Sequence, residues 1–395
     1  MSKIFSKIII LLLFFFAPIY VCAAEFNITG ENVILYNLND NEILYEQNSN
    51  ELTSIASLTK IMTALVAIEN IEDYDATITI TSKDFIGTDG YSKAGFSIGD
   101  KVTYRDLLYG ILLPSGADAV NAIVNNTLGY DDFITAMNAK AKEIGLKNTS
   151  FSNPVGKDDD DNYSTASDIA TLLKYALEND LFKEIFTTKE YTTTNGINLE
   201  CTLYPYKDIL DIDKIDGSKS GFTQGAGRCL ASITTLNGVD YLLVVIHSTT
   251  AQNYSAVLDT ITIYDYYNDN YSYQQILNTE DIIKTIPVKW SKVRTYNITS
   301  SEDVKLYLEN GTSDNIEVTY EGVEEIEYFT KKGTKLGTIT VSNGDEVLYT
   351  ADVTLASDIP YYNPLLLGIG IIVLLFIILL ILKKLKRKRR RRRKR

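Results

Sequence analysis

The sequence predicts an α+β domain, then a small all-β domain and a C-terminal transmembrane helix. Three observations lead to this prediction. Residues 25–270 mix strand and helix patterns, residues 280–358 hold short alternating stretches between turns, and residues 365–382 carry no charge. Mixed patterns indicate an α+β domain, and short strands at regular spacing indicate an all-β one. At 395 residues the chain is long enough for both domains.

The first 24 residues have the composition of a secretory signal peptide. Lys3 and Lys7 precede the apolar run Ile8–Ala17, and Cys22-Ala23-Ala24 supplies small residues for a cleavage site. This order predicts export with cleavage near Ala24, the alternative being an uncleaved N-terminal anchor.

The α+β domain opens with Asn32–Glu46, which predicts two strands around an Asn/Asp turn. Leu230–Thr235 and Val239–His247 predict a hairpin, because Asn237-Gly238 between them favours a two-residue turn. Helices are predicted at Ser57–Asn70, Tyr104–Leu113, Ala117–Asn125 and Ser167–Glu178. The first of these is apolar almost all round and is therefore expected to be buried.

The tyrosine-rich stretch Tyr264–Tyr273 predicts the boundary between the two domains. Beyond it, strands are predicted at Ile316–Tyr320, Lys335–Val341 and Glu346–Thr354, with Gly, Asn and Asp turns between them. This pattern is typical of a small all-β domain over 280–358.

The uncharged stretch Leu365–Leu382 predicts a membrane-spanning helix. At ~1.5 Å per residue it is nearly 30 Å long, which is enough for a bilayer. In Lys383–Arg395, 12 of 13 residues are basic. Such a run is also typical of nucleic-acid or lipid recognition, but its place directly after the span favours a stop-transfer signal that stays in the cytoplasm and contacts anionic lipid headgroups.

The formal net charge of −13 divides unevenly along the chain. The tail holds 12 Lys and Arg, the leader holds two Lys, and neither holds an acid, so residues 25–364 carry −27. An acidic body excludes nucleic acid as a partner unless it has a local basic patch. The single histidine, His247, excludes a zinc site built from several histidines. The acidic run Asp158–Asp161 lacks EF-hand spacing and predicts a solvated loop, so we expect no metal and no other cofactor.

Two cysteines remain after the leader, Cys201 and Cys229. A disulfide between them is permitted outside the cytoplasm, but their spacing does not place them side by side. A catalytic cysteine is disfavoured, because its histidine partner would have to be His247, which follows the strand-like run Tyr241–Ile246.

An exported hydrolase without available histidines needs another base, and a lysine with a lowered pKa can serve. Ser57-Leu58-Thr59-Lys60 places a serine and a lysine three residues apart, on one face of the predicted helix. The alternative is a serine that caps the helix and a lysine on the surface. The apolar surroundings argue against a surface lysine here, since burying an unpaired lysine is costly.

Two further stretches add groups suited to the same chemistry. Leu112–Gly116 places Ser115 at a turn before a helix. Asp216–Thr223 places Lys219, with hydroxyls and a glycine, on a predicted strand, where Gly221 would let a substrate backbone approach closely. Each stretch alone is equally typical of an ordinary turn or strand end.

Together these motifs resemble those of the penicillin-binding D-alanyl-D-alanine carboxypeptidases, the S11 serine peptidases, with their S-x-x-K, S-x-N and K-[TS]-G pattern. The family is also known as the low-molecular-mass penicillin-binding proteins. The resemblance covers about 25–358 and implies a serine β-lactamase/DD-peptidase-like (transpeptidase-like) catalytic domain over 25–272. The blocks that carry it are ASLTKIMTALVAIE (56–69), LLPSGADA (112–119), FSNPVG (151–156), YSTASDIATL (163–172), DGSKSGFTQGAGRCLA (216–231) and KKGTKLGTITV (331–341).

The resemblance implies a role for each motif residue. Ser57 would be the acylated nucleophile, Lys60 its general base, and Ser115 a proton relay toward the leaving D-alanine nitrogen. Lys219 would supply positive charge and depress the Lys60 pKa by repulsion. The hydroxyls of Ser220 and Thr223 would bind the substrate's terminal carboxylate. The backbone N–H groups of Ser57 and Phe222 would form the oxyanion hole.

The sequence departs from the family pattern at Ala117, where an asparagine usually orients the substrate's peptide carbonyl. Asn121, one helical turn later, is a candidate partial replacement. Ser220 stands for the commoner threonine, a mild change because the hydroxyl is kept. Phe222 and Asn162 stand where relatives often have histidines, so Phe222 is expected to contribute only its backbone N–H.

The resemblance thus implies a membrane-anchored D-alanyl-D-alanine carboxypeptidase that trims the pentapeptide of peptidoglycan and is acylated by β-lactams. Ala117 supports an alternative, a catalytically impaired protein that binds peptidoglycan on the same fold. A third interpretation, a β-lactamase, is disfavoured because residues 151–166 hold no glutamate to activate a water.

Overall fold

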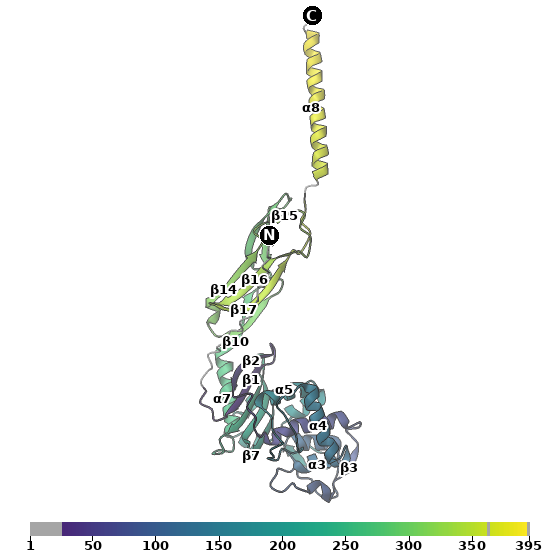
Figure 1. Ribbon diagram of the computed structural model, residues 1–395, viewed down its shortest axis with the longest axis vertical. Coiled ribbons are helices and arrows are strands. Elements are labelled where there is room, and N and C mark those ends of the chain that lie inside the picture. Colours follow the sequence, from purple (N-terminus) through teal and green to yellow (C-terminus); the bar gives the residue numbers. More distant parts are fainter. Residues whose placement is uncertain (1–25, 362–363, 393–395) are drawn as a thin grey trace, which may run out of the picture. The chain divides into compact units, whose positions relative to one another are not determined.

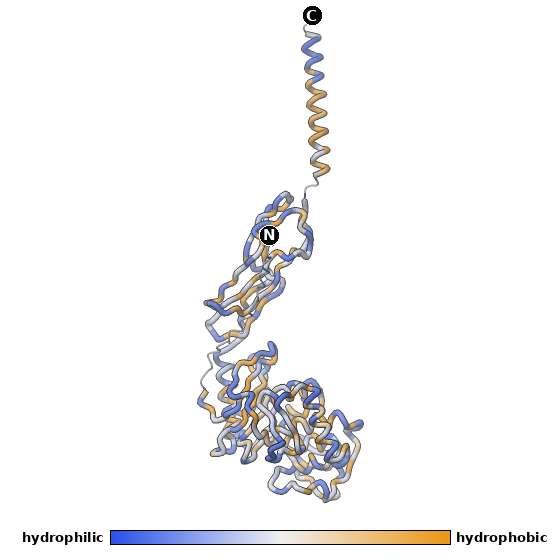
Figure 2. Tube along the Cα trace, in the orientation of Figure 1, coloured by the Kyte–Doolittle hydropathy of each residue, from blue (hydrophilic) through white to orange (hydrophobic). Residues whose placement is uncertain are grey.

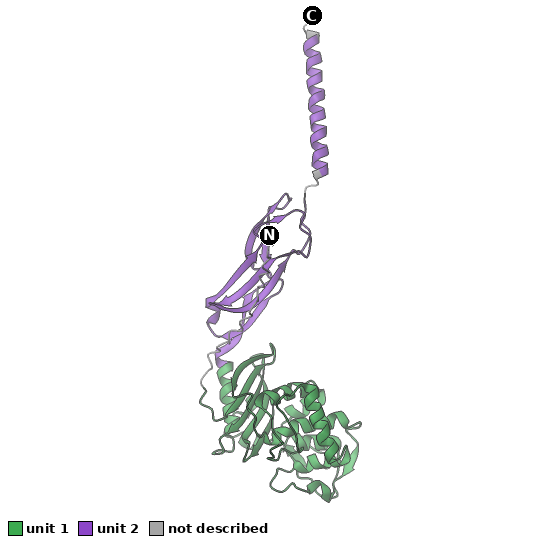
Figure 3. Ribbon diagram, viewed as in Figure 1, with its two compact units in different colours: residues 1–268 green, residues 269–395 purple. Residues whose placement is uncertain are grey.

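The computed structural model describes residues 26–361 and 364–392 and divides into two compact units between Asn268 and Asp269 (Figure 3). This division lies inside the tyrosine-rich stretch that the sequence marks as the boundary. The predicted signal peptide, residues 1–24, lies outside the described residues.

The first unit is built on a five-stranded antiparallel sheet. Its strands, in spatial order, are β2 (Glu42–Gln47), β1 (Asn32–Asn37), β9 (Val239–Ser248), β8 (Gly227–Leu236) and β7 (Gly217–Thr223). The predicted hairpin joins β8 and β9 through Asn237 and Gly238, both with positive φ as a tight turn of this kind requires. Two small ladders pair β3 (Thr77–Thr79) with β4 (Lys101–Thr103) and β5 (Glu190–Thr192) with β6 (Asn198–Glu200).

Helices cover both faces of this sheet, with α7 on one side and α5 on the other (Figure 1). The α-helices are α1 (Thr59–Asn70), α2 (Tyr104–Leu112), α3 (Ala117–Asn126), α4 (Tyr130–Ile144), α5 (Ala166–Ala176), α6 (Asp180–Thr187) and α7 (Ser255–Asn270). The 3₁₀ turns are η1 (Ala56–Leu58), η2 (Ser82–Phe85), η3 (Tyr204–Tyr206) and η4 (Ile212–Lys214). Every residue of α1 from Thr59 to Ile68 is buried, as its apolar pattern predicts.

The helix α7 extends into the stretch 264–273 that the sequence marks as the domain boundary. Its residues are rich in β-branched and aromatic types, which have low helix propensity, so tertiary contacts must stabilise it. Tyr264 shares a 2.9 Å hydrogen bond with the Ser232 hydroxyl on β8, and Tyr267 donates to the Leu44 carbonyl at 2.7 Å. Burial against the sheet therefore overrides the local preference of this segment.

The second unit contains three small sheets around an apolar core that includes Ile286, Ile298, Ile339 and Val341. It begins with β10, before the range 280–358 that the sequence suggests. The strands are β10 (Tyr271–Leu277), β11 (Ile282–Lys289), β12 (Thr295–Thr299), β13 (Val304–Glu309), β14 (Ile316–Gly322), β15 (Ile326–Glu327), β16 (Lys335–Asn343) and β17 (Glu346–Thr354), with η5 (Thr312–Asn315) between β13 and β14.

The last element in the described part of the chain is α8 (Pro364–Arg392), a helix of 29 residues. Among the described residues it alone has the length and apolar composition needed to cross a membrane. Figure 2 shows its apolar part followed by a hydrophilic C-terminal end. The predicted span and basic tail therefore form one continuous helix as far as Arg392.

Candidate active site

Ser57 lies in the 3₁₀ turn η1, immediately before α1. The turn is tight: Ala56 has a φ of +47°, in the left-handed region. Two glycines touch its backbone. A Cβ on Gly156 would overlap the Ala56 carbonyl, and one on Gly221 would lie 2.9 Å from the Ser57 nitrogen. Close packing thus fixes the position of the serine.

Lys60 lies one turn into the helical segment, and its Nζ is 2.9 Å from the Ser57 Oγ. The same Nζ donates to the Val155 carbonyl at 2.7 Å, and the side chain is 1% exposed. Burial lowers the pKa of Lys60 to about 7, against a smaller opposing effect of the Asp118 carboxylate. A large fraction of Lys60 is therefore neutral at physiological pH and able to accept a proton.

Ser115 lies in the connection between α2 and α3, with a φ of +64°. The adjacent Gly116 lets this connection pack closely against Ala94, since a Cβ there would be 2.7 Å from the Ala94 nitrogen. The Ser115 Oγ is buried and has no hydrogen-bond partner among the described residues. An unsatisfied buried hydroxyl beside Ser57 is suited to bond a ligand.

Lys219 lies on β7, is fully buried, and donates to the Ser220 carbonyl at 2.8 Å. Burial lowers its pKa well below the usual range, and repulsion from Lys60 lowers it further. The sequence-based expectation was that this repulsion would depress the Lys60 pKa. The structure differs, because burial is what lowers the pKa of Lys60.

The rest of β7 presents three different environments. The Ser220 hydroxyl is 2.6 Å from that of Thr202, and Phe222 is 44% exposed. The Thr223 hydroxyl turns to another partner, since it donates to Asp158 at 2.6 Å and accepts from the Ala226 nitrogen at 3.0 Å. Thr223 is absent from the lining of the pocket described next.

A pocket of about 400 Å³ opens in front of Ser57. It brings five of the predicted site residues together: Ser57, Ser115, Ser220, Gly221 and Phe222. The remaining lining residues are Gly90, Tyr91, Ser92, Thr202, Leu203, Pro205, Tyr206, Arg228, Cys229, Asn253, Ala256 and Val257. Lys60 and Lys219 are buried and do not line it.

Arg228 is a lining residue that the sequence motifs do not single out. It stands opposite Phe222 in the β7–β8 ladder, and its guanidinium carbon lies 4.1 Å from the centre of the Phe222 ring. One guanidinium nitrogen donates to Asn253, while its Nε is buried without a partner among the described residues. Of the side chains that line the pocket, Arg228 alone carries a charge at neutral pH. Arg228 reaches the pocket because the register of β8 against β7 places it opposite Phe222, and the spacing of the motifs does not reveal this register.

Asn121 does not take the place of the asparagine that the motif lacks. Its amide donates to the carbonyls of Asp84 and Ile86, at 3.1 and 3.0 Å, and so ties α3 to η2. Ala117 itself is buried at the start of α3 and donates its N–H to the Ser92 carbonyl at 2.8 Å. The expectation that Asn121 partly replaces the missing asparagine is therefore wrong, because the Asp84 and Ile86 carbonyls engage its side-chain amide.

The two cysteines are both free and buried. Cys229 lies on β8 and lines the pocket, and burial raises the pKa of its thiol to about 12. A thiol that stays protonated is a poor nucleophile, so the structure gives no catalytic role to Cys229.

Two family models match this chain. The first, described as D-alanyl-D-alanine carboxypeptidase, covers residues 20–250 and thus more than half of the chain. The chain belongs to the D-alanyl-D-alanine carboxypeptidase family. The second model, the C-terminal domain of penicillin-binding protein 5, covers residues 271–361, the β strands of the second unit. The predicted family is confirmed, and the chain is a serine peptidase of the hydrolase class.

Curated members of this carboxypeptidase family align over much of the chain. The D-alanyl-D-alanine carboxypeptidase DacF of Bacillus subtilis is 27% identical over 330 residues, 82% of each chain. The D-alanyl-D-alanine carboxypeptidase of Streptomyces sp. strain K15 is 33% identical over 212 residues, 50% of this chain and 73% of that one.

Solved structures agree on the fold. Penicillin-binding protein 5 from Haemophilus influenzae superposes with a TM-score of 0.62 at 22% identity, over 86% of this chain and 99% of that one. The Streptomyces K15 DD-transpeptidase superposes with a TM-score of 0.53 at 28% identity, over 62% and 98%. The predicted transpeptidase-like domain followed by an all-β domain is thus confirmed.

Proposed function

We propose that this protein is a membrane-anchored carboxypeptidase that removes the terminal D-alanine from peptidoglycan pentapeptides through an acyl-enzyme at Ser57. The observation that carries the proposal is the 2.9 Å contact between Ser57 Oγ and the Lys60 amine, whose pKa burial lowers to about 7. The contact places a base within proton-transfer distance of a hydroxyl.

In the acylation step, Lys60 takes the Ser57 proton as the Ser57 oxygen attacks the carbonyl carbon of the penultimate D-alanine. The N–H groups of Ser57 and Phe222 stabilise the oxyanion, an interaction worth ~10²–10³ in rate per donor. The C–N bond then breaks, and the proton passes from Lys60 through the Ser115 hydroxyl to the leaving D-alanine nitrogen. A water molecule hydrolyses the ester and releases the tetrapeptide.

Recognition of the terminal carboxylate is assigned to the β7–β8 edge of the pocket. Ser220 offers a hydroxyl there and Arg228 a permanently charged guanidinium, which matches a carboxylate with two parallel hydrogen bonds. The bound anion would also favour the protonated form of Lys219 behind the strand. A contact from Thr223 would require its hydroxyl to leave Asp158.

The proposed reaction has a consequence for the cell wall. A tetrapeptide product lacks the D-alanyl-D-alanine bond whose energy drives transpeptidation, so cross-linking is limited. β-Lactams, which present a strained amide to the same serine, are the expected covalent inhibitors. One apolar C-terminal helix suggests membrane anchoring, and the basic end of α8 would lie in the cytoplasm with the catalytic unit outside.

The test uses the purified full chain and diacetyl-Lys-D-Ala-D-Ala. Release of D-alanine, together with labelling by a fluorescent penicillin that Ser57→Ala abolishes, is the expected result. Labelling of Ser57→Ala would disprove the nucleophile assignment. Labelling without D-alanine release would favour the impaired binding protein that Ala117 suggests, and an Ala117→Asn variant would then show whether the missing amide is the reason.

A further inference from the structure

The second unit exposes aromatic side chains on three neighbouring segments. Trp290 is 78% exposed and Phe329 is 61% exposed, and Val293 and Tyr361 are also exposed. Trp290 moreover has a φ of +55°, a strained conformation for a bulky residue. Neither exposure nor strain contributes to folding stability, so the placement of Trp290 calls for a functional explanation.

A β-bridge, a hydrogen bond and a ring contact hold these segments together, so the aromatic residues lie at the same end of the second unit. Ser291 forms a β-bridge with Tyr361, and Lys292 donates its N–H to the Pro360 carbonyl at 2.9 Å. The rings of Tyr328 and Tyr361 lie 5.4 Å apart. We call the segments 289–294, 328–335 and 355–361 the aromatic end of the second unit.

The aromatic end is basic, in contrast to the acidic body. The segments 289–294 and 328–335 hold three basic residues each and no acid, and 355–361 adds only Asp358. Lys289 pairs with Glu325 and Lys335 with Asp352. The other basic residues are all exposed: Lys292, Arg294, Lys331 and Lys332.

The chain itself ties this surface to the apolar helix. Tyr361 is three residues before Pro364, where α8 begins. Three residues span at most ~11 Å of extended chain, and the headgroup layer on each side of a bilayer is roughly 5–8 Å deep. If α8 crosses a bilayer, Tyr361 therefore lies within or just outside the headgroup layer, and the aromatic end lies at the membrane surface.

We propose that the aromatic end is a membrane-docking surface, in which Trp290 and Phe329 enter the headgroup region and the neighbouring Lys and Arg contact anionic lipids. Tryptophan and tyrosine favour this interface, and each basic residue near an anionic surface adds attraction. This inference rests on the proposed membrane anchor. It adds a second contact by which the β unit would be held against the lipid.

The chain offers a direct test, because Trp290 is its only tryptophan. The full-length protein is reconstituted into vesicles of phosphatidylcholine and phosphatidylglycerol, with and without brominated acyl chains. The expected result is tryptophan emission shifted to shorter wavelength, quenched by the brominated lipid and shielded from iodide. Replacing phosphatidylglycerol by phosphatidylcholine, or introducing Lys331→Glu with Lys332→Glu, is expected to reduce the quenching.

A matched control moves the tryptophan to the opposite end of the same unit. Val347 is 59% exposed near the start of β17, seven residues from Thr354, about 23 Å along a strand. The variant Trp290→Phe with Val347→Trp is expected to show no quenching. Co-flotation with the vesicles reports the anchor separately. Protein that floats while Trp290 stays unquenched overturns the docking surface alone, and protein that fails to float overturns the anchor and this inference with it.

Discussion

The two units of the molecule differ in what they bury. The interior of the first unit contains whole charged side chains, among them Lys60, Lys219, Asp106 and Asp118, all 1% exposed or less. Among the described residues of the second unit, the one buried polar side chain is Ser300. Because burying a charge costs several kcal/mol unless it is paired, this contrast places the chemistry in the first unit.

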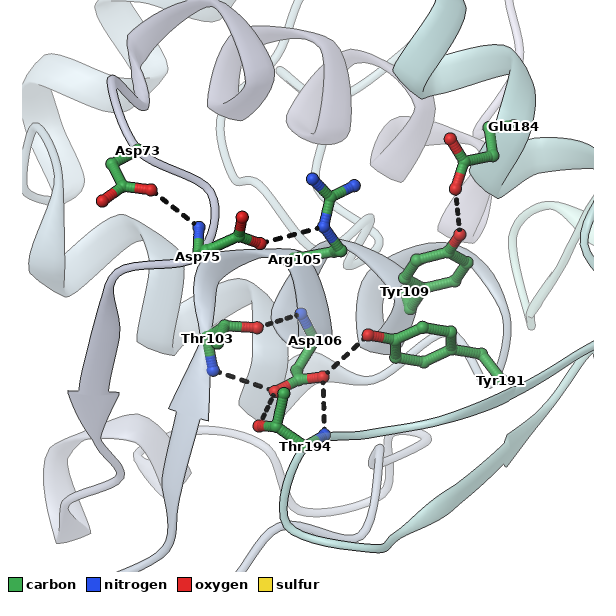
Figure 4. A network of polar contacts seen from close by, with 9 residues as sticks. All are labelled: Asp73, Asp75, Thr103, Arg105, Asp106, Tyr109, Glu184, Tyr191 and Thr194. Carbon is green, nitrogen blue, oxygen red and sulfur yellow. Dashed lines mark hydrogen bonds and ion pairs between the residues drawn. The ribbon is translucent and has the colours of Figure 1, made fainter.

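Within the first unit, the buried carboxylates differ in how completely they are hydrogen-bonded. Both oxygens of Asp106 are hydrogen-bonded: they accept from the N–H groups of Thr103 and Thr194, at 2.9 and 3.0 Å, and from the Tyr191 hydroxyl at 3.0 Å (Figure 4). Burial alone would raise the pKa of Asp106, but the bonds from Thr194 and Thr103 outweigh burial and lower it. Asp106 therefore joins α2 to the β5–β6 ladder as a structural group.

Asp118, in contrast, is left partly unsatisfied. Its Oδ1 accepts from the Ala94 nitrogen at 2.7 Å, but its Oδ2 has no hydrogen-bond partner among the described residues. The carboxylate acts on Lys60 through charge. Four buried side-chain atoms lack a hydrogen-bond partner among the described residues. Two belong to the pocket-lining residues Ser115 and Arg228, one to Asp118, and one to Thr260 on α7, which does not line the pocket.

The largest expected effect comes from removing the buried amine. Lys60→Met is expected to slow penicillin acylation by about 10²–10⁴, because the proposed general base is lost. The same change is expected to raise stability at neutral and lower pH. The folded-state pKa of about 7 lies below the ordinary 10.5, so the folded state resists protonation and the wild type gains stability as pH rises between these values.

Acylation rates and thermal unfolding across this pH range would measure both effects of Lys60→Met. A variant that acylates at the wild-type rate would remove Lys60 from the mechanism. A variant that loses stability at every pH would show that the hydrogen bonds to Ser57 and Val155 outweigh the cost of burial.

A pair of glycines tests whether packing around Ser57 matters for activity. Gly156 and Gly196 have nearly equal φ angles, +86° and +88°, but only Gly156 packs against the turn that carries Ser57. Alanine at either position pays ~1–2 kcal/mol for the left-handed conformation. Gly156→Ala is expected to lose more stability and much of its penicillin acylation, whereas Gly196→Ala keeps its acylation rate. Equal acylation rates in the two variants would contradict the claim that packing by Gly156 fixes the position of Ser57.

Matched core substitutions sharpen the contrast between the units. Ile61 on α1 and Ile298 in the second unit are both fully buried, and each alanine variant is expected to lose ~2–5 kcal/mol of stability. Only Ile61→Ala should also slow acylation, because α1 carries Lys60. Slower acylation by folded Ile298→Ala would show that the second unit influences the site.

Arg228→Gln is expected to raise KM for diacetyl-Lys-D-Ala-D-Ala by ~10–100-fold, since a charge-assisted hydrogen bond is worth ~1.5–3 kcal/mol. The substitution keeps a polar side chain beside Phe222. Arg228→Lys keeps the charge but loses the planar fork, and an intermediate KM is expected. An unchanged KM in both variants would exclude a contact with the carboxylate.

Sequence patterns predicted the parts of this site that are local. Ser57 and Lys60 face each other because of their spacing, and the turns at Ser115 and Asn237-Gly238 follow from their residue types. What escaped prediction depends on distant partners. Thr223 turns to Asp158, 65 residues away, and Arg228 enters the pocket through strand register.

The same distinction applies to the fold. The helix α1 and the hairpin follow local patterns, whereas α7 forms against its own propensity because Tyr264 and Tyr267 bury on the sheet. Repulsion between Lys60 and Lys219 was foreseeable from the motifs. The dominance of burial in the pKa of Lys60 was not, because it depends on the depth at which the whole protein encloses the amine.

The smallest expected effect concerns the tuning of Lys60 by Asp118. In the proposed mechanism the neutral amine is the active form, so acylation should rise with pH through about 7 in the wild type. The Asp118 carboxylate raises the Lys60 pKa, so Asp118→Asn should lower it and move the midpoint of the pH–rate profile to lower pH. An asparagine keeps the acceptor for the Ala94 nitrogen.

Asp168 provides the matched control for Asp118→Asn. It is also buried, at 8% exposure, and accepts from the Asn148 nitrogen at 2.7 Å, but it is not among the groups that shift the Lys60 pKa. Asp168→Asn should therefore leave the midpoint unchanged. If Asp118 has only a structural role, Asp118→Asn would lower the acylation rate at every pH and leave the midpoint unchanged. That outcome would show that burial alone sets the pKa of Lys60.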